Sequence, residues 1–140
     1  KGKLILISQE ERLSESFLRL ENEGFTEVSY FDINLWFDAG MEISQIDRVS
    51  ASDASKYIEK IIDVSNSEDW AVLHVKGVSN IPLKEVVKVP EKIVTDSVLY
   101  CGNGHKSMAA VSFLLTKNII TTDIMGGLSA MLVDSPDLEI

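Results

Sequence analysis

The sequence contains little cysteine and few histidines. Its single cysteine, Cys101, cannot form an internal disulfide. Together with only two histidines, His74 and His105, it falls short of an ordinary cysteine and histidine zinc site. We therefore expect no bound metal and no cofactor. Cys101 is either an inert buried thiol or a reactive one.

Positive charge is also scarce. The 13 basic and 22 acidic residues give a formal net charge of −9. Because nucleic acids and anionic membranes are bound by basic patches, neither is expected as a partner. No apolar run approaches the roughly 20 residues that cross a bilayer, and the residues after Lys1 lack a signal-peptide pattern. We predict a soluble protein, and a cytoplasmic one.

Apolar strand-like runs alternate with helical patterns along the 140 residues, which suffice for one domain and a fragment. This order predicts an α/β fold with a mainly parallel sheet and helices on both faces. The predicted strands are Lys3–Ile7, Glu27–Phe31, Ile61–Val64, Ser97–Tyr100 and Ile120–Ile124, with an extended stretch at Val75–Ile81. The predicted helices are Ser14–Glu23, Asn34–Phe37, one begun by the capping pair Ser50 and Asp53, Glu68–Val72, His105–Thr116 and Gly127–Leu132.

An internal repeat of about 40 residues is predicted, since the order strand, helix, strand, short helix occurs near both ends. Aligning the two copies with one single-residue gap pairs Ser8 with Cys101 and Ser14 with Ser107.

The segment Val98–Ser107 places Cys101 after an apolar strand, before two glycines and at a helix start. Such glycines let the loop curl so that successive peptide N–H groups point at the sulfur. The helix dipole and Lys106 add positive potential at the same place and favour the thiolate. A buried, inert cysteine is the alternative, but this context favours a reactive one.

Two other cysteine chemistries are excluded by single residues. A tyrosine phosphatase loop requires arginine six positions after the cysteine, where this chain has Ser107. A thioredoxin-type pair requires a second cysteine at position 104, which is Gly104.

Residues 101–107 resemble the active-site loop of rhodanese sulfurtransferases, and the likeness continues through Ile124-Met-Gly-Gly-Leu128. Upstream, residues 62–83 are similar to the family's second signature, an aspartate-valine-arginine strand followed by histidine, glycine and isoleucine-proline. Ser65 replaces the arginine of that pattern, which leaves the role of Asp63 open. His74 matches the signature histidine, and we expect it to be structural, closing a loop by a hydrogen bond.

The resemblance implies a thiosulfate or persulfide sulfurtransferase with Cys101 as nucleophile. It also implies a small sulfur donor, a thiol acceptor and a Cys101 persulfide. The substrate-binding residues that it implies are Gly102, Asn103, Gly104, His105, Lys106 and Ser107. Lys106 stands where the family often has arginine, and a lysine lacks the fixed guanidinium fork. The alternative is therefore a non-catalytic or receiver module that binds or accepts persulfide sulfur for another enzyme.

The resemblance also implies the domain organisation, a degenerate C-terminal half of a rhodanese repeat over residues 1–43 and a rhodanese-like domain over residues 44–140. Ser8 stands in the cysteine's place in the first copy, and Glu10 and Glu11 would repel an anion, so we expect this copy to be catalytically inactive. Half a domain leaves part of its sheet uncovered. We therefore expect a homodimer or an upstream domain that this chain lacks.

Overall fold

The computed structural model describes residues 2–140, which divide into two compact units. One unit ends at Ser44 and the other runs Gln45–Ile140.

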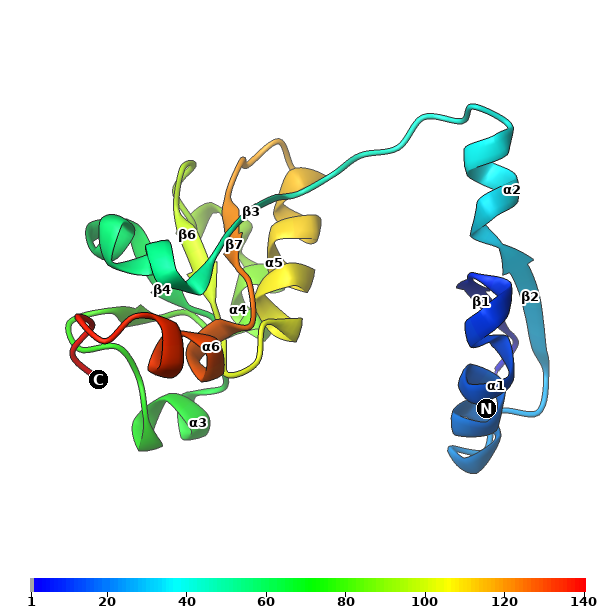
Figure 1. Cartoon of the computed structure of the whole chain (residues 1–140), viewed down its shortest axis with the longest axis horizontal. Coiled ribbons are helices and arrows are strands. Elements are labelled where there is room, and N and C mark those ends of the chain that lie inside the picture. Colours follow the sequence, from blue (N-terminus) through cyan, green and yellow to red (C-terminus); the bar gives the residue numbers. More distant parts are fainter. Residues whose placement is uncertain (1) are drawn as a thin grey trace. The chain divides into compact units, whose positions relative to one another are not determined.

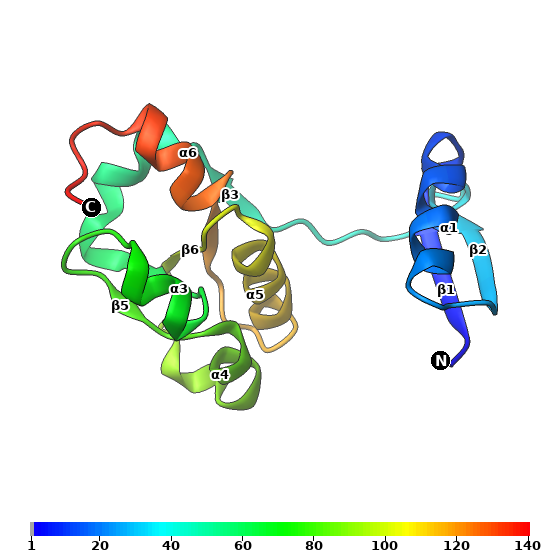
Figure 2. The same cartoon turned by 90° about the horizontal axis from the view of Figure 1, so that it is seen from below.

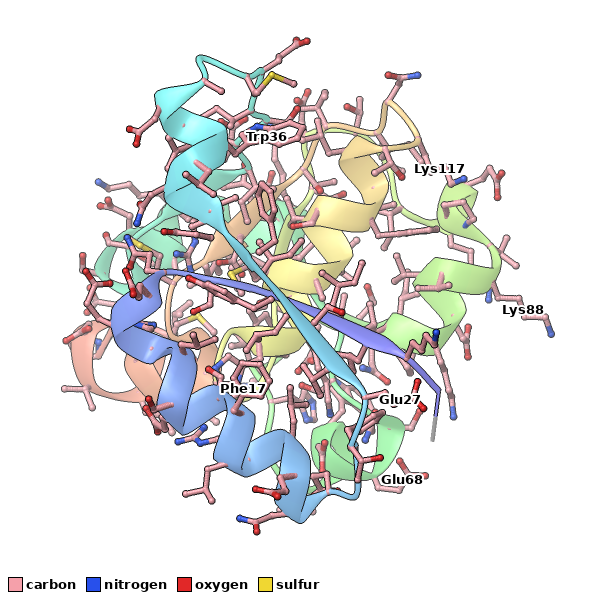
Figure 3. The ribbon with its side chains drawn as sticks, turned by 90° about the vertical axis from the view of Figure 1, so that its right-hand side faces the viewer. Phe17, Glu27, Trp36, Glu68, Lys88 and Lys117 are labelled. Atoms are coloured by element: carbon pink, nitrogen blue, oxygen red, sulfur yellow. The ribbon has the colours of Figure 1, made fainter. Side chains whose placement is uncertain are left out.

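The N-terminal unit is built on two parallel strands, β1 (Leu4–Ser8) and β2 (Val28–Asp32) (Figure 1). The 3₁₀ turn η1 (Glu10–Arg12) and helix α1 (Leu13–Asn22) connect them, and helix α2 (Ile33–Asp38) follows β2. Figure 3 marks Phe17 on α1 and Trp36 on α2. No residue of 2–44 is fully buried, so this unit has no closed core.

The C-terminal unit contains a five-stranded parallel sheet in the order β3-β7-β6-β4-β5. The strands are β3 (Asp47–Val49), β4 (Ile61–Asp63), β5 (Ser79–Asn80), β6 (Val98–Tyr100) and β7 (Thr122–Ile124). The helical segments are η2 (Ala51–Lys60), α3 (Ser67–Val72), α4 (Leu83–Lys88), η3 (Pro90–Lys92), α5 (His105–Leu115) and α6 (Gly127–Asp134). The central strand is therefore β6, which Cys101 follows.

Two apolar cores cover the two faces of this sheet, and Figures 1 and 2 show α4 and α5 on the side opposite α6. Side chains alternate along β6, so that Val98 and Tyr100 join the core under η2 and α6. Leu99 and Cys101 join the other core, under α4 and α5. The side chain of Cys101 thus belongs to the face that α5 covers.

These observations confirm the predicted α/β fold with a parallel sheet and helices on both faces. The sequence interpretation missed β3 and α4, which are only three and six residues long. The segment after Ser50 is a 3₁₀ helix, and the Ser50 hydroxyl donates to the Asp53 carboxylate instead of capping a peptide N–H.

Both units contain a parallel strand pair joined through a helix, β1 with β2 and β6 with β7. The predicted internal repeat stays a prediction. Within residues 2–140, no helix combines the length and the apolar character needed to cross a membrane.

Candidate active site

Cys101 lies at the carboxyl edge of the parallel sheet, directly after the central strand β6. Ligands of such sheets bind at this edge. The residue is only 1% exposed, yet it lines an open pocket of about 420 Å³. The other lining residues are Asp69, Leu73, Gly102, Asn103, Lys106, Leu128, Ser129 and Leu132. Cys101 therefore borders an open pocket although it is almost completely buried.

The loop after Cys101 leaves several peptide N–H groups free to bind an anion. Within residues 2–140, the N–H groups of Gly102, Asn103, Gly104, Lys106 and Ser107 have no hydrogen-bond acceptor. Gly104 has φ +85°, a conformation that favours glycine and begins α5. None of these N–H groups donates to the Cys101 sulfur in the described part of the chain, and three of the residues, Gly102, Asn103 and Lys106, line the pocket.

Gly126 and Gly127, at the start of α6, allow this helix to approach the Cys101 loop closely. A Cβ at Gly127 would lie 2.0 Å from the Cys101 carbonyl oxygen, so only glycine fits there. The close approach lets the Leu128 N–H donate to the Cys101 carbonyl at 2.8 Å. The Ser129 N–H and hydroxyl both donate to the Gly102 carbonyl, each at 2.9 Å. The start of α6 thus holds the loop carbonyls.

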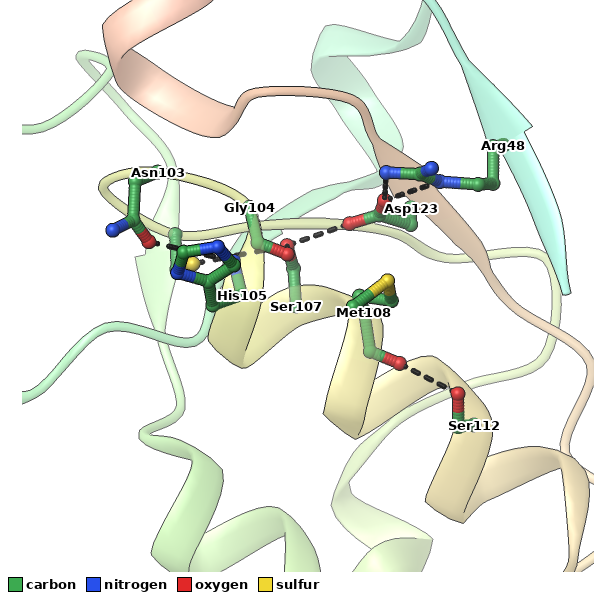
Figure 4. Close-up of polar contacts among 9 residues, drawn as sticks. Arg48, Asn103, Gly104, His105, Ser107, Met108, Ser112 and Asp123 are labelled. Atoms are coloured by element: carbon green, nitrogen blue, oxygen red, sulfur yellow. Dashed lines mark hydrogen bonds and ion pairs between the residues drawn. The ribbon is translucent and has the colours of Figure 1, made fainter. Parts of the chain in front are cut away.

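A chain of polar contacts joins Ser107, Asp123 and Arg48, which are labelled in Figure 4. The Ser107 hydroxyl is 2.6 Å from Asp123 Oδ1 and 3.8 Å from Cys101 Sγ. Arg48 pairs with Asp123 Oδ2 through Nε at 2.9 Å and a terminal nitrogen at 2.8 Å. Arg48 and Asp123 are register partners on β3 and β7, so the sheet itself brings them together. The guanidinium balances a carboxylate that is completely buried.

The charged residues at the pocket are paired with each other. Lys106 Nζ lies 3.1 Å from Asp69 Oδ2 on α3. His105 is exposed, and its N–H is 3.4 Å from the Asn103 side-chain oxygen. Of the predicted substrate-binding residues, Gly102, Asn103 and Lys106 line the pocket. Gly104, His105 and Ser107 are not among the lining residues in the described chain.

The residues of the upstream signature have structural partners. The His74 Nδ1 lies 2.8 Å from the Trp70 carbonyl, and the two rings stack at 4.1 Å. This agrees with the structural role expected of His74. Asp63 accepts the Ser65 N–H at 2.7 Å, so the carboxylate whose role the sequence left open caps a turn.

Tyr100, next to the cysteine, points into the opposite core, where its hydroxyl accepts the Val75 N–H at 3.1 Å. Its burial raises the pKa of the phenol well above the ordinary value of 10.0. Tyr100 therefore stays neutral and serves as a structural anchor for the end of β6.

Sequence reasoning missed Asp123, Arg48 and Asp69. The available signal for Asp123 was an acidic residue within a short strand otherwise suited to burial, a position that requires a partner. Nothing local in the sequence pointed to Arg48 or Asp69 as the partners. Within residues 2–140, no group of three His, Cys, Asp or Glu side chains is placed to hold a metal ion.

In a comparison with protein-family models, the model of the rhodanese-like domain matches residues 47–132 of this chain. The chain belongs to the rhodanese-like domain family. The rhodanese-like match includes β3, Cys101 with its loop, and most of α6. A comparison with curated proteins found no match.

Solved rhodanese-like structures share the fold. A rhodanese-related protein from Thermoplasma volcanium is 22% identical over 64% of this chain and 93% of its own, with a TM-score of 0.58. Reduced CoADR-RHD from Bacillus anthracis is 23% identical over 68% of this chain and 18% of its own, with a TM-score of 0.60.

A thiosulfate sulfurtransferase from Pseudomonas aeruginosa is 17% identical over 96% of this chain and 32% of its own, with a TM-score of 0.57. At these identities, the likeness of all three structures shows the fold.

Proposed function

We propose that this chain is a sulfurtransferase in which Cys101 carries a sulfane sulfur from a small donor to a thiol acceptor. The observation that carries the proposal is that Cys101 lines an open pocket and is followed by five N–H groups without an acceptor in the described chain, three in the loop and two in the first turn of α5. Such groups stabilise negative charge on a thiolate or on a persulfide.

The proposed reaction has two displacements. The Cys101 thiolate attacks the outer sulfur of thiosulfate or a persulfide, and that S–S bond breaks as sulfite or a thiolate leaves with the bonding electrons. An acceptor thiolate then attacks the outer sulfur of the Cys101 persulfide. This second step releases the Cys101 thiolate and forms the acceptor persulfide.

Two parts of the site have distinct proposed roles. The Gly102 and Asn103 N–H groups, from residues that line the pocket, would hold the persulfide anion. The Leu128 and Ser129 contacts to the loop carbonyls would keep that loop in place as charge moves to and from the sulfur.

A receiver module that is loaded by another enzyme and turns over little thiosulfate is the second candidate. It is favoured by the near-complete burial of Cys101 and by the pairing of Lys106 with Asp69, which leaves less positive charge for a dianion. Both candidates require a Cys101 persulfide, and they differ in turnover.

Intact-mass measurement tests the shared step. After incubation with thiosulfate or an organic persulfide, we expect a gain of one sulfur atom in the wild type and none in Cys101→Ala. The yield of thiocyanate from cyanide then distinguishes the two candidates. Many molecules of thiocyanate per chain would support the enzyme, and a single molecule per chain would support the receiver module. No added sulfur from any donor would overturn both candidates.

We propose that the N-terminal unit is the degenerate C-terminal half of a rhodanese repeat and that it has no catalytic role. Ile5, Ile7 and Phe31 are exposed on its two-stranded sheet, which supports a covering partner such as a second copy of the chain or a further domain. Light scattering tests the homodimer, and we expect Ile7→Lys to lower a dimer's mass to the monomer value. A monomeric wild type would exclude the homodimer.

A further inference from the structure

The pocket lined by Cys101 has three apolar leucine side chains and no net charge. Leu73, Leu128 and Leu132 contribute the apolar side chains. Asp69 and Lys106 contribute one negative and one positive charge, and no other charged residue lines the pocket in the described part of the chain. The formal charge of the lining residues is therefore zero.

Two of these leucines lie open to solvent at the pocket. Leu73, directly after α3, is 45% exposed, and Leu132 on α6 is 51% exposed. Because they line the same pocket from different elements, a ligand bound there would cover both. Covering exposed apolar surface stabilises a complex in proportion to the area removed from water.

Lys106, the lysine that lines the pocket, is already paired with a carboxylate and is less available to bind an anion. Its ammonium group lies 3.1 Å from the Asp69 carboxylate, which an incoming dianion would also meet. A doubly charged donor without an organic group, such as thiosulfate, would be repelled by Asp69 and would leave the leucines uncovered. A donor with an apolar group and a terminal sulfur would cover the leucines and would carry less negative charge toward Asp69.

We propose that this pocket selects organic hydropersulfides, R–S–SH with an apolar R group, as sulfur donors over thiosulfate. The inference rests on the proposed sulfur transfer at Cys101. The Cys101 thiolate attacks the outer sulfur of R–S–SH, the S–S bond breaks, and R–S⁻ leaves with the electron pair and takes up the proton of the outer sulfur. The products are the Cys101 persulfide anion and R–SH, with no net oxidation.

The apolar contribution is tested by replacing the exposed leucines one at a time and measuring the rate at which Cys101 gains sulfur. With benzyl hydropersulfide as donor, we expect Leu73→Ser and Leu132→Ser each to slow loading about fivefold. Thiosulfate has no apolar group to contact these leucines, so the same variants should slow thiosulfate loading far less than loading from benzyl hydropersulfide. Dividing each variant's rate by that of the wild type removes the intrinsic reactivity of the two donors.

Matched controls come from neighbouring exposed positions that do not line the pocket. Val72 precedes Leu73 and is 84% exposed, and Val133 follows Leu132 and is 78% exposed. Neither valine lines the pocket. Val72→Ser and Val133→Ser should keep the wild-type rate with both donors.

The charge contribution is tested on α3 with an isosteric change. Asp69→Asn frees Lys106 and removes the repelling charge, so we expect thiosulfate loading to accelerate about fivefold at low salt. Glu68, marked in Figure 3, is the adjacent exposed carboxylate outside the pocket. Glu68→Gln should change thiosulfate loading far less than Asp69→Asn.

The outcomes separate this inference from the function on which it depends. If Cys101 gains sulfur but the leucine variants lose equal rate with both donors, or lose none, the selection for an apolar group is wrong. Equal acceleration by Asp69→Asn and Glu68→Gln would likewise contradict the role of Asp69. Absence of any sulfur on wild-type Cys101 from either donor overturns the proposed transfer itself.

Discussion

Ser107 donates a hydrogen bond to Asp123 across the interior, with 2.6 Å between Ser107 Oγ and Asp123 Oδ1 and both residues completely buried. The hydroxyl has one proton and three acceptors within reach, since the Gly104 carbonyl is at 3.2 Å and Cys101 Sγ at 3.8 Å. A carboxylate at the shortest distance takes that proton most of the time. The longer contact to Cys101 Sγ is therefore the weaker one.

Removing the Ser107 hydroxyl tests its contribution to the stability of the protein. We expect Ser107→Ala to lower the free energy of unfolding by about 1–2 kcal/mol, because Asp123 loses a buried donor. Urea unfolding measures the change. Ser112 is the matched control on the same helix, since it is exposed and, among residues 2–140, its hydroxyl bonds only to the Met108 carbonyl at 2.8 Å (Figure 4). Ser112→Ala should stay within about 0.5 kcal/mol of the wild type.

Arg48 and Asp123 are predicted to depend on each other in their contributions to the free energy of unfolding. Asp123→Asn should destabilise the protein by about 2 kcal/mol, since it leaves the guanidinium without its anion beside a buried amide. In a double-mutant cycle with Arg48→Gln, we expect a coupling energy of about 1–2 kcal/mol. Strictly additive effects in urea unfolding would show that the pair contributes nothing beyond its two separate residues.

Gly127 is predicted to tolerate no side chain. Gly127→Ala places a Cβ 2.0 Å from the Cys101 carbonyl at φ +59°, so we expect a loss of about 3 kcal/mol in the free energy of unfolding. Gly77 has φ +80°, and a Cβ added there would meet nothing within 4 Å, so this position separates backbone strain from the steric clash. Gly77→Ala should cost only about 1 kcal/mol. Equal losses would mean that the contact with Cys101 is unimportant.

Alkaline stability is predicted to depend on Tyr100. Burial raises the pKa of this phenol in the folded protein, so the unfolded chain releases the proton first as the pH rises above 10.0. Stability contributed by the neutral phenol is thus complete below pH 10.0 and falls above it. In Tyr100→Phe, this part of the decline should vanish, although the variant loses about 1 kcal/mol at neutral pH because the Val75 N–H is unpaired.

Absorbance of tyrosinate checks this assignment directly. In the wild type, one phenol should ionise only together with alkaline unfolding, and Tyr100→Phe should lack that phase. A Tyr100 signal that appears before the unfolding transition would contradict the prediction.

Local patterns were sufficient to predict most elements of the C-terminal unit and the position of Cys101. The apolar run before Cys101 and the glycines after it act over a few neighbouring residues, so strand, loop and helix start follow from the sequence. Strand β3 and helix α4 were missed, because elements of three and six residues leave too little periodicity to detect.

The sequence by itself determined the α/β alternation, the single cysteine in its glycine loop and the shortage of positive charge. Only the tertiary structure decided that Arg48 meets Asp123 and that Lys106 meets Asp69, which are 75 and 37 residues apart. Strand register and helix packing bring such partners together through contacts that span the whole domain, and no local spacing encodes them. The charge and apolar lining of the pocket above Cys101 are therefore properties of the fold.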